Sequence, residues 1–263
     1  MKLASLFLGY CLQDLKFHLA YRGDLIAEGI GFLAMVVVEL AMVWYVVAPV
    51  PALAGWTQPQ MVFMYSLCLT SVALFFATGL NLFYLPGDYI VGGQLDRLLV
   101  RPVDPYVQLL MERLSASDLV TFFAGIGLTA WSLQLLKMPL TLPLLGYLIA
   151  AVLGGGMILL GLMTAFASVS FWLKDKWGAL WSVFPMLENV ARLPLNIFPR
   201  SAQFVLSTLL PLGFVTFYPV ATLFADSRGP LWGYGTLAVG IITMGVGYGC
   251  WRLGLRSYES SGA

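Results

Sequence analysis

Residues 144–173 read LLGYLIAAVLGGGMILLGLMTAFASVSFWL and contain no charged side chain. The charge-free interval is longer still, with 36 residues between Lys137 and Lys174. A helix that crosses the hydrocarbon core of a bilayer needs about 20 mostly apolar residues. This run therefore predicts a membrane-spanning helix, long enough to tilt or to extend beyond the bilayer.

The rest of the chain repeats this pattern. Uncharged intervals hold 48 residues between Glu39 and Asp88, 18 between Asp118 and Lys137, 25 between Arg200 and Asp226, and 23 between Arg228 and Arg252. Of 263 residues, 60% are hydrophobic and 10% charged, whereas soluble domains have about 45–50% apolar and 25% charged residues. The composition excludes a soluble fold and a disordered chain, and a net charge of +1 argues against a nucleic-acid partner. Continuous apolar runs predict an all-α polytopic membrane protein and exclude a β-barrel.

Five spans can be placed from these runs: 27–47, 61–82, 119–136, 144–173 and 231–251. Before the first span, residues 1–24 carry a narrow polar stripe at helical spacing (Lys2, Ser5, Gly9, Gln13 and Lys16). This stripe predicts an amphipathic helix that lies in the interface and contacts membrane lipid.

The segment 177–224 is ambiguous. Residues 177–195 could cross the membrane, although they include Glu188, Asn189 and Arg192; residues 201–223 are more apolar but are interrupted by Pro211 and Pro219. Either choice gives six spans with the same orientation of the termini. With 177–195 crossing, ten basic residues fall on the side of both termini and four on the other, which predicts cytoplasmic termini.

The most polar part of the chain is the loop at residues 84–114. Within it, Gln94–Val100 has leucines at helical spacing, preceded by Gly92 and Gly93 and followed by Pro102, which ends a helix. A short amphipathic helix between such breakers can dock into a groove of a soluble partner. It can equally be an ordinary loop helix on the membrane surface, and the residues alone leave both readings open.

This loop resembles the coupling-helix region of ABC-2 type permeases, the transmembrane subunits of ABC transporters. The matching residues are Gly93-Gln94-Leu95-Asp96, Leu98-Leu99 and Arg101-Pro102-Val103. Residues 194–199 (PLNIFP), followed by an apolar run and Pro211, are similar to the region just outside the fifth span of these permeases, and residues 255–262 are similar to the ending of one bacterial branch.

The resemblance implies the six-span architecture of type V exporters, with 177–195 as the fifth span and 196–226 as a re-entrant segment on the outer side. It implies a bacterial inner (plasma) membrane protein with cytoplasmic termini that forms a homodimer or a heterodimer with a paralogous permease. It also implies an ABC ATPase subunit that binds ATP and Mg, contacted through Asp88, Gly93, Gln94, Leu95, Asp96, Arg97, Leu98, Arg101 and Pro102. One departure is that Asp88-Tyr89-Ile90-Val91 stands where many of these permeases carry more charge.

No catalytic or metal site is expected in this chain. It has no Gly-x-x-x-x-Gly-Lys-Ser/Thr phosphate loop, so no bound cofactor is predicted and ATP must be hydrolysed by a partner. The single histidine, His18, excludes a His-based metal cluster, and Cys11, Cys68 and Cys250 lack metal or redox spacing. Glycine pairs within the spans, such as Gly125/Gly127 and the set Gly245/Gly247/Gly249, indicate close helix packing.

Charged residues inside the spans are the remaining candidates for function. Glu39 lies in mid-span, where a carboxylate costs about 2.5–3.5 kcal/mol on insertion scales. We expect it either to line a substrate path with Phe75, Phe76 and Phe122, or to be protonated or hydrogen-bonded to another span. Glu188 and Arg192, four residues apart, can form a structural pair on one helix face.

Two broad functions compete. The first is the permease of an exporter for a hydrophobic or amphipathic substrate, a drug-like molecule or a lipid. The second is an ion-coupled secondary transporter that uses Glu39 as its proton site, although no internal repeat relates the two halves of the chain, as it does in many carriers.

Overall fold

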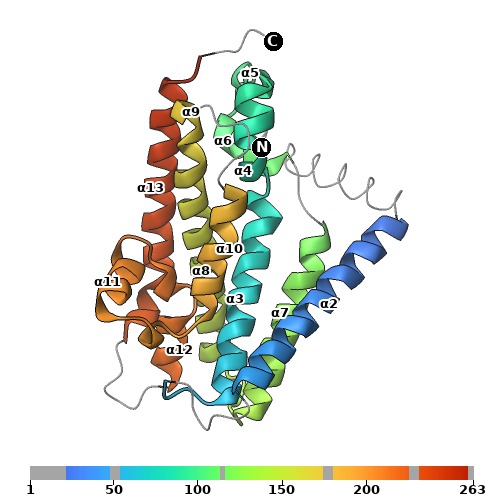
Figure 1. Ribbon diagram of the computed structural model, residues 1–263, viewed down its shortest axis with the longest axis vertical. Coiled ribbons are helices and arrows are strands. Elements are labelled where there is room, and N and C mark those ends of the chain that lie inside the picture. Colours follow the sequence, from blue (N-terminus) through green and yellow to red (C-terminus); the bar gives the residue numbers. More distant parts are fainter. Residues whose placement is uncertain (1–21, 48–53, 113–115, 174–179, 225–230, 260–263) are drawn as a thin grey trace.

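The computed structural model describes residues 22–47, 54–112, 116–173, 180–224 and 231–259, and these form helices joined by short connections (Figure 1). The long helices are α2 (Arg22–Val47), α3 (Gln58–Gly79), α7 (Ala116–Leu135), α8 (Leu142–Ser168), α10 (Leu180–Arg192) and α13 (Thr236–Arg256). The short helices are α4 (Asn81–Tyr84), η1 (Leu85–Val91), α5 (Gln94–Leu99), α6 (Pro105–Met111), α9 (Ser170–Leu173), η2 (Leu195–Ile197), α11 (Arg200–Thr208), η3 (Leu212–Phe214), α12 (Phe217–Phe224) and η4 (Leu231–Gly235).

Within these described ranges, four helical segments are long and apolar enough to cross a membrane. They are Gln58–Gly79, Asp118–Leu135, Leu142–Leu173 and Trp232–Arg256. Helix α2 contains a shorter apolar stretch, Gly29–Ala41, within its 26 residues. The expectation of an all-helical, multi-pass membrane protein is confirmed.

Helix α3 is the centre of the molecule. Helices α7 and α8 both pack against it, α2 packs along α7, and α13 packs along α8 (Figure 1). The apolar window of α3 is 78% buried, against 22% for that of α7 and 28% for that of α13. The outer helices therefore expose apolar side chains, as is expected where the surrounding solvent is hydrocarbon.

Glycines allow α8 and α13 to approach backbone to backbone. A Cβ atom at Gly161 would lie 2.5 Å from the carbonyl oxygen of Thr243, and one at Gly240 would lie 2.7 Å from that of Gly154. Gly247 abuts Gly161, whereas Gly245 and Gly249 have no heavy atom near the position of a Cβ. Of the expected set Gly245/Gly247/Gly249, therefore, only Gly247 lies in the contact. On each helix the contacting glycines are seven residues apart, Gly154 and Gly161 on α8 and Gly240 and Gly247 on α13.

The region of the expected fifth span is divided into short pieces. The described part of helix α10 has 13 residues, is about 20 Å long and ends at Arg192. Figure 1 shows it running from near α4 to mid-height, with α11 and α12 in the half of the molecule away from α5. In the described residues, neither 177–195 nor 201–223 forms one continuous helix, so the six-span architecture stays a prediction. Most of the expected helix over residues 1–24 lies outside the described residues.

Replacing Gly247 tests the close approach of α8 and α13. Gly247→Ala places a methyl group against the Gly161 backbone, and such overpacking costs about 1–3 kcal/mol. We expect a lower thermal midpoint for the detergent-purified protein. Gly249→Ala, two residues further along α13, meets open space and should leave the midpoint unchanged or higher. Equal midpoints for the two variants would contradict the packing described.

Candidate functional site

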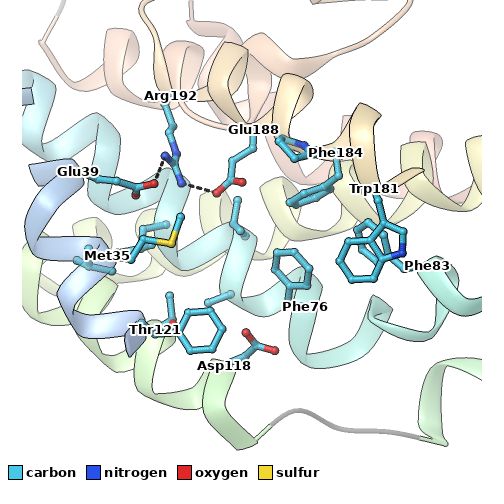
Figure 2. A pocket seen from close by; sticks show the side chains of 16 residues that line it. Met35, Glu39, Phe76, Phe83, Asp118, Thr121, Trp181, Phe184, Glu188 and Arg192 are labelled. Atoms are coloured by element: carbon cyan, nitrogen blue, oxygen red, sulfur yellow. Dashed lines mark hydrogen bonds and ion pairs between the residues drawn. The ribbon is translucent and has the colours of Figure 1, made fainter. Parts of the chain in front are cut away.

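A cavity of about 220 Å³ lies between α2, α3, α7 and α10 (Figure 2). It is lined by charged, polar and aromatic side chains from all four helices and from α4. The lining includes Met35 and Glu39 from α2, Phe76 from α3, Phe83 from α4, Asp118 and Thr121 from α7, and Trp181, Phe184, Glu188 and Arg192 from α10.

Arg192 joins two walls of this cavity. Its Nη1 donates to Glu39 Oε1 at 2.8 Å, and its Nη2 donates to Glu188 Oε1 at 2.5 Å. The second oxygen of Glu39 accepts from the Tyr65 hydroxyl at 2.7 Å, and the guanidinium lies 5.5 Å from the centroid of the Tyr65 ring. The network links α2, α3 and α10 through groups whose side chains are about four-fifths buried.

This network changes the interpretation of Glu39, which is not an isolated carboxylate. Its partner is 153 residues away in the sequence and on another helix. The expected contact between Glu188 and Arg192 is present, and it is half of a three-residue cluster with two carboxylates and one cation. Removing one partner of a buried ion pair is costly because the other charge is left uncompensated.

Aromatic rings form the other part of the cavity wall. Phe76 and Phe184 meet edge to face with centroids 4.8 Å apart, and Phe83 lies 4.5 Å from Trp181. Phe76 and Phe83 are stacked at 5.8 Å. The cavity therefore combines an ionic end and an aromatic end.

The expected substrate-path residues do not gather in one place. Glu39 and Phe76 line the cavity, but Phe75 is 1% exposed, stacks on Phe184 at 4.9 Å and lies in the core. Phe122 lines a separate apolar groove of about 370 Å³ between α7 and α8. The reason is helical geometry, since consecutive residues point about 100° apart. Phe75 and Phe122 thus do not line the cavity that contains Glu39, and their place in a substrate path stays a prediction.

Several cavity residues were not singled out from the sequence. Trp181 and Phe184 share one face of α10 with Glu188 at spacings of three and four residues, so helical spacing from Glu188 could have placed them in the cavity. Asp118 and Thr121 share a face of α7 in the same way. Tyr65 gave no signal, because an uncharged tyrosine in an apolar run looks like a packing residue.

The loop at residues 84–114 builds a compact unit around α5. A π-helical segment, η1, precedes α5, and Gly93 makes the turn between them with φ of +71°, a conformation that favours glycine. Leu95 and Leu98 of α5 are fully buried. The exposed residues among the described part of this unit are Asp88, Gly92, Gln94, Arg97, Leu99, Val100, Arg101, Pro102 and Asp104.

The outer surface of α5 thus differs from the expected contact set. Leu95 and Leu98 point inward and hold α5 in place, whereas Leu99 and Val100, which were not in that set, are 41% and 86% exposed. The α5 surface, here Gln94, Arg97 and Leu99–Pro102, is therefore a mixed apolar and basic patch.

Specific hydrogen bonds tie α5 to α6. The Gln108 amide donates to the carbonyl oxygens of Leu98 and Val103 at 3.1 and 2.7 Å. Arg97 pairs with Glu112, which also accepts from the Tyr89 hydroxyl of η1 at 2.6 Å. The end of α5 therefore cannot move without α6.

Helix α6 is fastened in turn to the long helices. The Tyr106 hydroxyl lies 2.8 Å from Thr164 Oγ1 on α8, and burial raises the pKa of Tyr106 to about 12, so it stays neutral. Asp104, which caps α6, accepts from the Tyr248 hydroxyl of α13 at 2.6 Å. These contacts connect α6 to both α8 and α13.

Comparison with known proteins gives one match. The profile of a family described as ABC-2 family transporter protein matches residues 33–262. No curated protein and no solved structure matches the chain.

Substitutions in the Arg192 network should lower the stability of the protein in proportion to the unpaired charge that each one leaves. Arg192→Gln leaves two carboxylates without a cation, at a cost of about 3–5 kcal/mol, whereas Glu39→Gln leaves a balanced Glu188–Arg192 pair. We expect the thermal midpoint to fall furthest for Arg192→Gln, with Arg192→Lys intermediate because it keeps the charge but loses the forked donors. A larger loss for Glu39→Gln than for Arg192→Gln would refute this ranking.

Proposed function

The chain belongs to the ABC-2 family of transporter proteins, and we propose that it is the permease of an ATP-driven exporter that works with a separate ABC ATPase. The observation that carries the proposal is the exposed α5 surface, held on buried Leu95 and Leu98 and fastened to the long helices. A transport subunit without its own nucleotide site needs such a surface to receive force from its ATPase.

The proposed architecture has six spans and two permease subunits, as a homodimer or a heterodimer with a paralogue. In this architecture α10 belongs to the fifth crossing. The short helices from Leu195 to Phe224 belong to the re-entrant segment on the outer side. The α5 end of the molecule faces the cytoplasm of a bacterial cell, and the basic residues favour this orientation.

In the proposed mechanism the ATPase pushes on α5 when it closes on ATP. The movement passes to α6 through Gln108 and Glu112, and from α6 to α8 and α13 through Tyr106 and Asp104. Because α8 and α13 are interlocked at their glycines, they move together as one rigid pair. The chain holds no ATP and transmits only the movement.

The proposed substrate path includes the cavity between α2, α3, α7 and α10. Its aromatic wall suits a hydrophobic or amphipathic molecule, and its ionic end supplies the polar contacts that fix an orientation. The Glu39–Arg192 contact ties α2 to α10 across this cavity, so movement of these walls must break or rearrange it.

Val100→Asp tests the role of the α5 surface. Val100 is 86% exposed, so the charge should not disturb folding, but it should weaken an apolar contact with the ATPase. We expect the complex of the chain with its ABC ATPase subunit to lose most of the ATP hydrolysis that the permease stimulates. Substituting the residues that anchor α5 would be less informative, because they are buried.

Leu142→Asp is the matched control. Leu142 is 83% exposed at the start of α8, away from α5, where an acidic residue suits the helix N-terminus. ATP hydrolysis should be unchanged in this variant. Normal, permease-stimulated hydrolysis in Val100→Asp would overturn the assignment of α5 as the ATPase contact.

A further inference from the structure

Thr121 is an unexplained polar group in the wall of the cavity. This residue is only 8% exposed, and its Oγ1 has no hydrogen-bond partner. The other threonine hydroxyls of α3 and α7 are satisfied, for example that of Thr129, which donates to Gly125 O at 2.8 Å. A buried hydroxyl without a partner costs about 1–3 kcal/mol, so a ligand that pairs with it is favoured.

The charges around Thr121 indicate the sign of that ligand. Glu39 and Glu188 line the same cavity and share Arg192, the one cation among its described lining residues, so this cluster has one carboxylate more than it has cations. In Figure 2, Asp118 and Thr121 lie across the cavity from the Arg192 network. A largely buried cluster with one more carboxylate than cation favours a positively charged guest.

The guest is organic rather than a metal ion. In the described parts of the chain, no three His, Cys, Asp or Glu side chains are placed so that they could hold a metal. The cavity is also lined by the aromatic rings of Phe76, Phe184 and Trp181, and the face of such a ring attracts a cation that is attached to an apolar group. A volume of about 220 Å³ suits a small amine with a single ring.

We propose that the cavity binds a small primary ammonium ion that carries an aromatic ring. Its N–H groups donate to Thr121 Oγ1 and to the cavity carboxylates, and its ring lies against Phe76 and Phe184. This inference rests on the proposed function, because it names the substrate class of the same path, but binding itself requires no ATPase.

The test is binding of 2-phenylethylammonium to the full-length chain in lipid nanodiscs, measured by titration calorimetry. Neutral 2-phenylethanol, of nearly the same shape, is the comparison ligand. We expect saturable binding of the amine, at least about tenfold tighter than that of the alcohol, which corresponds to one new charged contact. No saturable binding of the amine, or equal affinity for both, would overturn the proposal.

Thr121→Val and Thr129→Val give opposite expectations on the same helix. Thr121→Val removes an unpartnered hydroxyl, so the thermal midpoint should stay equal or rise while the amine binds about three- to tenfold more weakly. Thr129→Val removes a satisfied hydroxyl outside the cavity, so the midpoint should fall while affinity stays the same. Unchanged amine affinity in Thr121→Val would contradict the assigned contact.

Glu188→Gln supplies a second variant. Its amine affinity should fall while its affinity for 2-phenylethanol does not, and Glu259→Gln, exposed near the end of the chain, should change neither. If the unmodified chain does not bind the amine but still stimulates its ATPase, this inference is wrong and the proposed function stands. If the chain binds the amine but does not stimulate an ATPase, the proposed function is wrong and the binding site stands.

Discussion

A charge inside a membrane protein must be compensated by another charge or a hydrogen bond. In this protein Arg192 meets that requirement by connecting helices that surround the cavity. Its guanidinium is shared by Glu39 on α2 and Glu188 on α10, with Tyr65 of α3 completing the cluster. The network holds three helices around the cavity. Because the pairing crosses the space through which a substrate would pass, the same contacts that stabilise this conformation oppose any movement of the cavity walls.

The other helix contacts follow from the apolar environment. Without a hydrophobic driving force between helices in lipid, α8 and α13 associate through close backbone packing at Gly154, Gly161, Gly240 and Gly247. At the α5 end, where water is available, the contacts change to capped and hydrogen-bonded ones such as Asp104 with Tyr248 and Gln108 with Leu98. In the proposed mechanism the partner contacts the α5 end, and the glycine contacts make α8 and α13 move together.

The sequence predicted features that depend on local pattern. Charge-free runs located α3, α7, α8 and α13, because hydrocarbon thickness sets the length of a span. Glycine and proline bracketed α5, and the spacing of Glu188 and Arg192 predicted their contact. The sequence could not predict that Glu39 meets Arg192, that Gly247 packs while Gly249 does not, or that α10 ends at Arg192. Each of these depends on which helices become neighbours, which is decided by the whole chain.

The central claim is that ATP-driven force on α5 moves the walls of the cavity, and spin labels at Val37 on α2 and Met186 on α10 can report this directly. Both side chains are well exposed. In the permease–ATPase complex, with Cys11, Cys68 and Cys250 replaced by alanine, the distance distribution between the labels should shift between the nucleotide-free state and the state trapped with ATP. The same distribution in both states, in a complex that still hydrolyses ATP, would contradict the claim.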